Sequence, residues 1–229
     1  ADELFAYDNG ILEAATGFGK TVIGTYLIAK KKVSTLIILQ NSELIEQWKD
    51  AINNFLDIRE EAPVYKTKNG KEKKRESVIG VLSGGKDTLS GIIDIAMVLS
   101  LQHKSEINDL IDNYGLVIID ECQHSASKTC RDVLDRINAR YVYGLTATPQ
   151  RSDKLDPLIY MMIGPIRHQY TAMQRTIDNG MKHYIVPRFT RCVSFGNKDI
   201  NEEYELIAND KMRNEMIVSD IRKCVDNKH

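Results

Sequence analysis

The sequence has little of what marks a membrane, secreted or strongly basic protein. Its uninterrupted apolar runs are only a handful of residues long, as at 36–39, far short of the about 18 residues that span a bilayer. No signal peptide is visible, and we expect no membrane partner. The formal net charge of −1 means that any nucleic-acid binding must come from a local surface or from backbone contacts.

Cysteines are also scarce. The chain has four, and they share no CxxC spacing and have no histidine cluster around them: Cys122, Cys130, Cys192 and Cys224. This pattern argues against a zinc site and against a disulfide framework. We therefore expect reduced thiols and a cytoplasmic protein.

The length and composition indicate an ordinary globular chain. At 229 residues there is room for one full α/β domain with additions, or for two small domains. Hydrophobic residues make up 42% and charged residues 28%, close to the averages for soluble proteins, which excludes collagen-like and largely disordered classes.

Short apolar segments alternate with segments of helical period. Continuous apolar strands alternating with amphipathic helices predict a mainly parallel sheet covered on both faces. Strands are predicted up to residue 12 and at 33–39, 78–82, 92–99, 116–119, 141–145 and 166–170. Helices are predicted at 20–31, after N-caps at Ser42 and Ser127, at 153–162 and 171–179, and around 217–225. Residues 64–77 are lysine-rich and predict an exposed loop or hairpin, and 197–201 predict a linker.

The strongest local signal is the run AATGFGKT at 14–21, between a predicted strand and a predicted helix. It fits the phosphate-binding loop, except that Ala14 replaces the first glycine. Small residues let consecutive backbone N–H groups turn toward a phosphate at a helix N-terminus. Lys20 would reach the β- and γ-phosphates, and the Thr21 hydroxyl would bind Mg²⁺. The alternative is an ordinary glycine turn before a helix.

An acidic pair follows the predicted strand 116–119. Because the carboxyl ends of parallel strands form the ligand-binding edge of such sheets, Asp120 can face the same Mg²⁺ as Thr21. Glu121 can then orient or deprotonate the attacking water. An acidic pair alone is usually a solvated loop, but the phosphate loop upstream favours a catalytic role.

A threonine pair, Thr146 and Thr148, follows the predicted strand 141–145. Hydroxyls beside Asp120 and His124 could hydrogen-bond that loop and relay whether a γ-phosphate is present. Threonines also commonly satisfy backbone groups in turns, and the segment by itself favours that structural role.

Three segments in this order, ATGFGKT, DECQH and TATPQR, resemble the DExH branch of superfamily-two helicases and translocases. Within that branch the sequence looks most like the group that holds the transcription-repair helicases, the excision-repair damage-loading helicase and the helicase subunit of type III restriction enzymes. The specific motifs run from residue 10 to residue 153, with a weaker continuation to residue 214. The resemblance implies a RecA-like P-loop NTPase domain, an α/β three-layer sandwich that uses ATP and Mg²⁺.

The resemblance also implies roles for individual residues. ATP binding falls to Ala15, Thr16, Gly17, Phe18, Gly19, Lys20 and Thr21. Mg²⁺ binding is assigned to Thr21 and Asp120. Hydrolysis is assigned to Lys20, Asp120, Glu121, Gln123 and His124. Gln123 and His124 would also couple hydrolysis to DNA movement through Thr146 and Thr148. Nucleic-acid contacts fall to Gln40, Asn41, Ser42, Gly84 and Gly85. The family's usual proline is replaced by Asn41, and its Thr-Gln-Ser-Leu segment appears here as Met97 to Leu101, which departs from the pattern.

The resemblance predicts a domain at 1–194, then a linker and helix at 195–229 that lead to a second RecA-like domain outside this sequence. Such motors hydrolyse ATP between two domains, and the second brings an arginine finger. The upstream glutamine motif that reads adenine is also missing. We therefore expect the first motor domain of a DNA helicase or translocase, nearly inactive alone. DNA, duplex or partly single-stranded, is the expected partner, with nuclease or modification modules of a restriction or defence system as further candidates.

Two other functions remain open: a nucleotide-regulated scaffold that does not use hydrolysis, and an RNA-directed helicase, since backbone contacts carry little base information. Several other signals favour structural roles. The cations between Lys66 and Arg75 predict a solvated hairpin tip rather than a phosphate grip, because glutamates interrupt them. Trp48 is predicted to pack in the core rather than stack on a base, and Cys122 to pack rather than act as a nucleophile.

Overall fold

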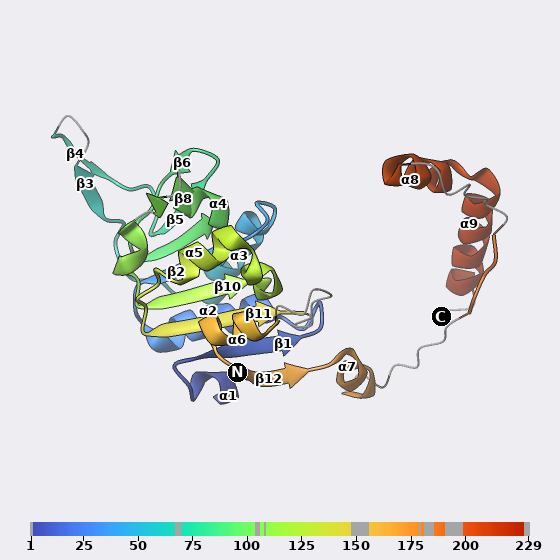
Figure 1. The fold of residues 1–229 in the computed structure, drawn as a ribbon, viewed down its shortest axis with the longest axis horizontal. Helices are drawn as coiled ribbons and strands as arrows, with labels where there is room; N and C mark the ends of the chain where they lie inside the picture. The colour runs from blue at the N-terminus through green and yellow to red at the C-terminus, as the bar shows by residue number, and fades with distance from the viewer. Residues whose placement is uncertain are drawn as a thin grey trace. The chain divides into compact units, whose positions relative to one another are not determined.

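The computed structural model describes residues 2–66, 70–103, 106–107, 109–147, 156–178, 180, 186–190 and 199–226 (Figure 1). Its contacts divide the chain into two compact units, residues 1–181 and residues 182–229. The predicted domain boundary at 194/195 lies outside the described residues. Within the described ranges, no helix is both long enough and apolar enough to cross a membrane.

The first unit is built on a mainly parallel sheet. In the described residues the sheet has eight strands, in the order β12 (Ile166–Tyr170), β1 (Asn9–Ala14), β11 (Tyr141–Thr146), β10 (Leu116–Asp120), β2 (Thr35–Leu39), β7 (Ile93–Met97), β5 (Ile79–Ser83) and β6 (Lys86–Asp87). Every neighbouring pair is parallel except β5 with β6. The predicted parallel sheet is confirmed.

Helices cover both faces of this sheet (Figure 1). One face packs on α1 (Asp2–Phe5), α2 (Lys20–Lys31) and α3 (Leu44–Phe55), and the other on α4 (Val98–Leu101), α5 (Lys128–Leu134) and α6 (Asp156–Ile163). Successive strand residues point to opposite faces, so Ile37 and Ile118 join the first core while Ile38 and Val117 join the second. This arrangement confirms the predicted three-layer sandwich.

Smaller elements decorate the sheet. The lysine-rich segment forms an antiparallel hairpin of β3 (Val64–Lys66) and β4 (Glu72–Lys74), one of the two predicted forms. A second short pair joins β8 (Gln102–His103) and β9 (Glu106–Ile107). The 3₁₀ helices η1 (Asp109–Asn113) and η2 (Cys122–Ala126) flank β10, and α7 (Ala172–Asp178) follows β12.

Two of the boundaries predicted at the carboxyl edge of the sheet are wrong. Ser42 does not cap α3: the helix follows Glu43, whose N–H donates to the side chain of Asn41 at 3.0 Å, so a local Asn turn takes the place of a serine cap. The strand predicted at 92–99 ends at Met97, where Val98 begins a helix. The reason is that Met97 pairs with Leu39, the last residue of β2, beyond which no ladder partner continues.

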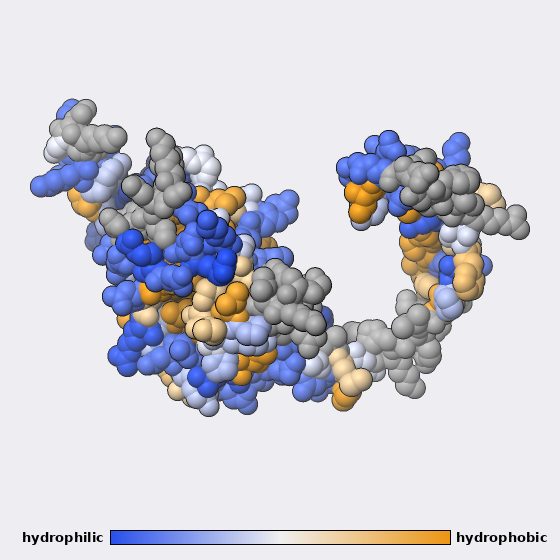
Figure 2. Space-filling model, viewed as in Figure 1, coloured by the Kyte–Doolittle hydropathy of each residue, from blue (hydrophilic) through white to orange (hydrophobic). Residues whose placement is uncertain are grey.

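Within its described residues, the second unit contains two helices, α8 (Ile200–Asn209) and α9 (Lys211–Asp226). The predicted last helix is present. Of the linker expected at 197–201, residues 197 and 198 lie outside the described residues, and α8 begins at Ile200, whose N–H is capped by the Asp199 side chain. The sequence does contain a helical signal in this segment, because the apolar residues Ile200, Tyr204 and Ile207 are spaced four and three apart. The polar residues between them made the segment look like a linker. Neither helix has a buried residue, and Figure 2 shows apolar side chains among polar ones on their surface.

Candidate active site

The loops that carry the three sequence motifs leave neighbouring strands at one edge of the sheet. Strand β11 lies between β1 and β10, and all three run parallel. Their register pairs Glu13 with Thr146 and Asp120 with Leu145, so the three strands end level with one another. Lys20 and Asp120 therefore lie at the same carboxyl edge, where open α/β sheets bind their ligands.

The phosphate loop has the backbone that anion binding requires. Gly17 and Gly19 have φ angles of 78° and 93°, which favour glycine because a side chain there would be strained. Helix α2 begins directly after Gly19, and no side chain of the described residues caps it, so its first N–H groups are available to an anion. Lys20 Nζ donates to the carbonyl oxygen of Ala14 at 3.1 Å and so lies across the loop.

Residues outside the three sequence motifs hold this loop from α7 and β12. The Arg175 guanidinium donates to the carbonyl oxygen of Thr16. The Ala15 N–H donates to the Tyr170 carbonyl at 3.1 Å, and the Phe18 and Tyr170 rings lie with centroids 4.4 Å apart. Arg175 is 159 residues from its partner, and no local pattern in the sequence signals the contact.

Asp120 is held at both carboxylate oxygens. Trp48 Nε1 donates to Oδ2 at 2.8 Å, and the Glu121 N–H donates to Oδ1 at 3.0 Å. Asp120 is 6% exposed, and this burial raises its pKa; the Trp48 hydrogen bond and the charge of Lys20 act in the opposite direction. A bound cation would further favour the ionised carboxylate.

The structure links Glu121 to the threonine motif through one glutamine. Gln123 Nε2 donates to Glu121 Oε2 at 2.7 Å, and Thr146 Oγ1 donates to Gln123 Oε1 at 2.6 Å. Glu121 itself has a φ of 51°, an uncommon left-handed conformation for a residue with a side chain. His124 is exposed in η2, and Thr148 lies outside the described residues.

Thr21 and Asp120, the two residues expected to bind Mg²⁺, would offer a cation one hydroxyl and one carboxylate. Gln47 Nε2 donates to Thr21 Oγ1 at 3.2 Å. Among the described residues, no cluster of three or more histidine, cysteine or acidic side chains could hold a metal ion. One hydroxyl and one carboxylate nevertheless fit Mg²⁺, which keeps several waters and commonly takes its other ligands from substrate phosphates.

The residues expected to contact nucleic acid lie at the same edge of the sheet. Asn41 and Ser42 are exposed just after β2, while Gln40 is half-buried and its Nε2 donates to Cys130 Sγ at 3.5 Å. Gly84 and Gly85 form the exposed turn between β5 and β6. Strand β7 separates β2 from β5, so these two segments are on alternate strands of the sheet.

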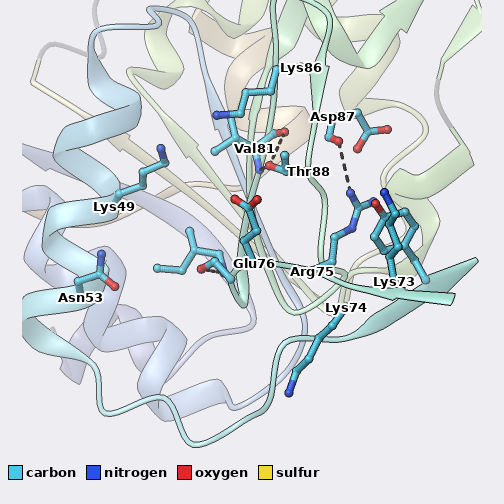
Figure 3. A pocket seen from close by; sticks show the side chains of 13 residues that line it. Lys49, Asn53, Lys73, Lys74, Arg75, Glu76, Val81, Lys86, Asp87 and Thr88 are labelled. Atoms are coloured by element: carbon cyan, nitrogen blue, oxygen red, sulfur yellow. Dashed lines mark hydrogen bonds between the residues drawn. The ribbon is translucent and has the colours of Figure 1, made fainter. Parts of the chain in front are cut away.

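A basic pocket of about 540 Å³ lies between the β3–β4 hairpin, α3 and the β5–β6 edge (Figure 3). Its charged lining residues are Lys49, Lys73, Lys74, Arg75, Lys86, Glu76 and Asp87. Lys74 Nζ pairs with Glu61 at 2.8 Å, and the Arg75 guanidinium lies 4.1 Å from the Tyr65 ring centroid. These two hairpin cations thus have partners within the domain, which favours the solvated-hairpin interpretation. Lys86, which also lines the pocket, directly follows Gly84 and Gly85, two of the residues expected to contact nucleic acid.

The two structural roles predicted for Trp48 and Cys122 fit their surroundings. Trp48 is fully buried, which confirms core packing, although its bond to Asp120 was not foreseen. Cys122 is 1% exposed, and burial raises the pKa of its thiol, so it remains a protonated packing residue.

Fold and site together define a RecA-like P-loop domain at whose carboxyl edge the three motifs meet. The family model for the type III restriction enzyme res subunit matches residues 5–151, and the chain belongs to this family. It is an N-terminal RecA-like domain of the superfamily-two helicase type, as the motifs predicted.

The relatives are considerably longer proteins. The DNA 3'-5' translocase XPB2 of Sulfurisphaera tokodaii is 31% identical over 157 residues, covering 69% of this chain and 31% of that protein. Putative helicase 161L of Invertebrate iridescent virus 6 is 26% identical over 213 residues, covering 93% of this chain and 45% of that protein. The chain therefore spans less than half of the length of each.

The fold is shared with solved helicase structures. The UvsW helicase of bacteriophage T4 superposes with a TM-score of 0.58 at 16% identity, over 73% of this chain and 57% of that chain. The Hef helicase domain of Pyrococcus furiosus superposes with a TM-score of 0.54 at 17% identity, over 74% and 36%.

Proposed function

We propose that this chain is the ATP- and DNA-binding motor domain of a superfamily-two DNA helicase or translocase. The observation that carries the proposal is the meeting of four groups at one sheet edge: the phosphate loop with Lys20, the Thr21 hydroxyl, the held carboxylate of Asp120, and Glu121 bonded through Gln123 to Thr146. This set matches the parts that phosphoryl transfer needs, namely a phosphate cradle, a metal site and a group that orients water.

Each residue then has a distinct task. Lys20 and the N–H groups of residues 15–21 bind the phosphates of ATP, and Thr21 with Asp120 would hold Mg²⁺. When bound, Mg²⁺ neutralises the charge on the phosphate oxygens. Glu121 orients the attacking water and accepts its proton, and Gln123 keeps the Glu121 carboxylate in place. Because Gln123 also bonds Thr146, a change at the phosphates can reach the threonine loop, with His124 and Thr148 as further members of that coupling.

DNA would follow the exposed loops at the same edge, through Gln40, Asn41, Ser42, Gly84 and Gly85. A relative named a DNA translocase supports DNA as the partner, although another relative is named a putative ATP-dependent RNA helicase. Backbone contacts of this kind read little sequence, so an RNA-directed helicase is the alternative. The family name suggests a restriction system, with nuclease or modification modules as further partners.

A second RecA-like domain of the same longer polypeptide would complete the site and supply an arginine finger. The relatives are more than twice as long as the segment they share with this chain, which supports that expectation. The exposed apolar side chains of α8 and α9, such as Tyr204 and Ile221, are suited to pack against such a domain.

Alone, this chain is expected to bind nucleotide weakly and hydrolyse it slowly. In the described part of the chain Cys122, Cys130 and Cys224 are free thiols, which is compatible with the cytoplasmic location that we propose.

Nucleotide binding tests the proposal directly. Lys20→Ala is expected to weaken Mg²⁺·ADP binding about 10- to 100-fold, because charge-assisted hydrogen bonds to phosphate are lost. Isothermal titration calorimetry of the purified chain measures this. Lys30→Ala, an exposed lysine in the last turn of the same helix, is the matched control and leaves the affinity unchanged. Equal affinity of the Lys20 variant and the unchanged chain would contradict the proposal.

DNA binding is tested at the β5–β6 turn. Lys86→Ala, directly after Gly85, is expected to weaken DNA binding and to lower the slope of log affinity against log salt by about 1, the loss of one phosphate contact. Lys74→Ala is the control, because Lys74 already pairs with Glu61 and is expected to leave the slope unchanged. The measurement is fluorescence anisotropy of a labelled duplex across a salt series. A larger effect of Lys74 than of Lys86 would place the DNA on the hairpin instead.

A further inference from the structure

One helix supports both proposed metal ligands. Consecutive residues of α3 each donate a hydrogen bond to one of them: Gln47 Nε2 to Thr21 Oγ1 at 3.2 Å, and Trp48 Nε1 to Asp120 Oδ2 at 2.8 Å. Thr21 and Asp120 lie 99 positions apart in the sequence and on different elements. Helix α3 therefore ties the first turn of α2 to the end of β10.

The two contacts differ in how firmly they are held. Gln47 is exposed, so water can replace its bond to Thr21. Trp48 is 0% exposed, and its bond to Asp120 is buried. A buried carboxylate oxygen that loses its donor incurs a desolvation cost, so the tryptophan contact is the stronger constraint.

The indole reaches Asp120 because α2 has a glycine where the ring passes. A Cβ placed on Gly24 would lie 2.4 Å from Trp48 Cη2, closer than any side chain tolerates. The ring is thus wedged between α2 and the sheet, and its N–H direction is set by packing. Since the Glu121 N–H occupies the other oxygen, the Asp120 carboxylate is fixed at both ends and keeps its remaining lone pairs for another ligand.

We propose that Trp48 is a positioning residue of the metal site: its buried indole N–H holds the Asp120 carboxylate in the orientation that binds Mg²⁺. This inference rests on the proposed function, because it assigns the support of the same site. Hydrogen-bonded partners of ligating carboxylates typically contribute 10- to 100-fold to metal affinity. The same geometry makes the chain's single tryptophan a reporter of metal binding, because a cation at Asp120 changes the electric field at the indole.

Trp48→Phe removes the N–H and keeps an aromatic ring in the core. Calorimetry over a Mg²⁺ series gives the Mg²⁺ concentration at which the ADP affinity is halfway between its values in EDTA and in saturating Mg²⁺. This concentration is expected to be about 10-fold or more higher for Trp48→Phe than for the unchanged chain. ADP affinity in EDTA is expected to stay within about twofold of that of the unchanged chain, because among the described residues the Trp48 side chain bonds to Asp120 and not to the phosphate loop. Tyr143→Phe is the matched control: it removes the part-buried hydrogen bond from the buried Tyr143 side chain to the Tyr7 carbonyl without touching the metal ligands.

A purely structural role for Trp48 predicts a different result. In that case both variants lower the thermal midpoint and neither alters the Mg²⁺ requirement, an outcome that overturns the inference. A shift in the Mg²⁺ requirement confined to Trp48→Phe supports it.

Tryptophan emission of the unchanged chain provides a test that does not depend on a variant folding. The emission is expected to change when Mg²⁺ and ADP are added together, and to stay constant with ADP in EDTA. Mg²⁺-dependent ADP binding seen by calorimetry with unaltered emission overturns the inference alone. An unchanged chain that binds no nucleotide under either condition overturns the proposed function and this inference with it.

Discussion

Glu121→Gln, introduced into the longer polypeptide that we propose to carry both motor domains, is expected to reduce DNA-stimulated ATP hydrolysis by about 10²- to 10⁴-fold, the usual contribution of a general base. The amide cannot accept the proton of the attacking water. Binding of ATP should survive, because the phosphate loop and Asp120 are untouched. Release of phosphate with and without duplex DNA measures the rate, and calorimetry with ADP and Mg²⁺ measures the binding.

Glu46→Gln is the matched control for this loss of charge. Glu46 is exposed on α3, and among the described residues its ion-pair partner is Lys49. Its hydrolysis rate is expected to equal that of the unchanged protein. A full rate from Glu121→Gln would instead favour the nucleotide-regulated scaffold. Comparing stimulation by duplex DNA, single-stranded DNA and RNA separates the DNA motor from its RNA-directed alternative.

The largest expected loss of stability lies away from the nucleotide, at Asp94 in β7. This carboxylate is fully buried and accepts hydrogen bonds from the Ser90 N–H at 2.7 Å, the Gly91 N–H at 2.6 Å and the Tyr114 hydroxyl at 2.7 Å. Asp94→Ala leaves the buried Tyr114 hydroxyl and the two part-buried N–H groups without their acceptor. A donor that loses its partner costs about 1–3 kcal/mol when buried, so we expect a total loss of about 3–5 kcal/mol in the free energy of unfolding. Urea denaturation followed by circular dichroism measures the shift.

Asp94→Asn separates lost hydrogen bonds from lost volume, because the amide keeps one acceptor oxygen and nearly the same shape. Its effect is expected to fall between the unchanged chain and Asp94→Ala. Asp87→Ala is a second control: Asp87 is exposed and its side chain accepts from the Leu89 N–H at 3.1 Å, so a loss below about 1 kcal/mol is expected. A loss below about 1 kcal/mol from Asp94→Ala would contradict the assignment of this buried hub.

Much of the fold could be predicted because it depends on local sequence. Apolar runs such as 116–119 must be buried on both faces, and amphipathic segments such as 20–31 must cover them, which together define a parallel sheet between two helical layers. The phosphate-loop glycines and the strand that precedes Asp120 are contiguous patterns, so the motifs and the family to which they belong were readable. Boundaries that depend on a neighbour were not, as at Met97, where the partner strand ends.

The sequence by itself determined the class of domain, the order of its motifs and the edge of the sheet at which they meet. Only the tertiary structure decided what holds those motifs in place: Trp48 on Asp120, Gln123 between Glu121 and Thr146, and Arg175 on the phosphate loop. The physical reason is that a motif is a local run of chain, whereas a hydrogen bond between distant residues depends on how helices pack. The space that Gly24 leaves for the Trp48 ring is an example that no pattern in either helix reveals.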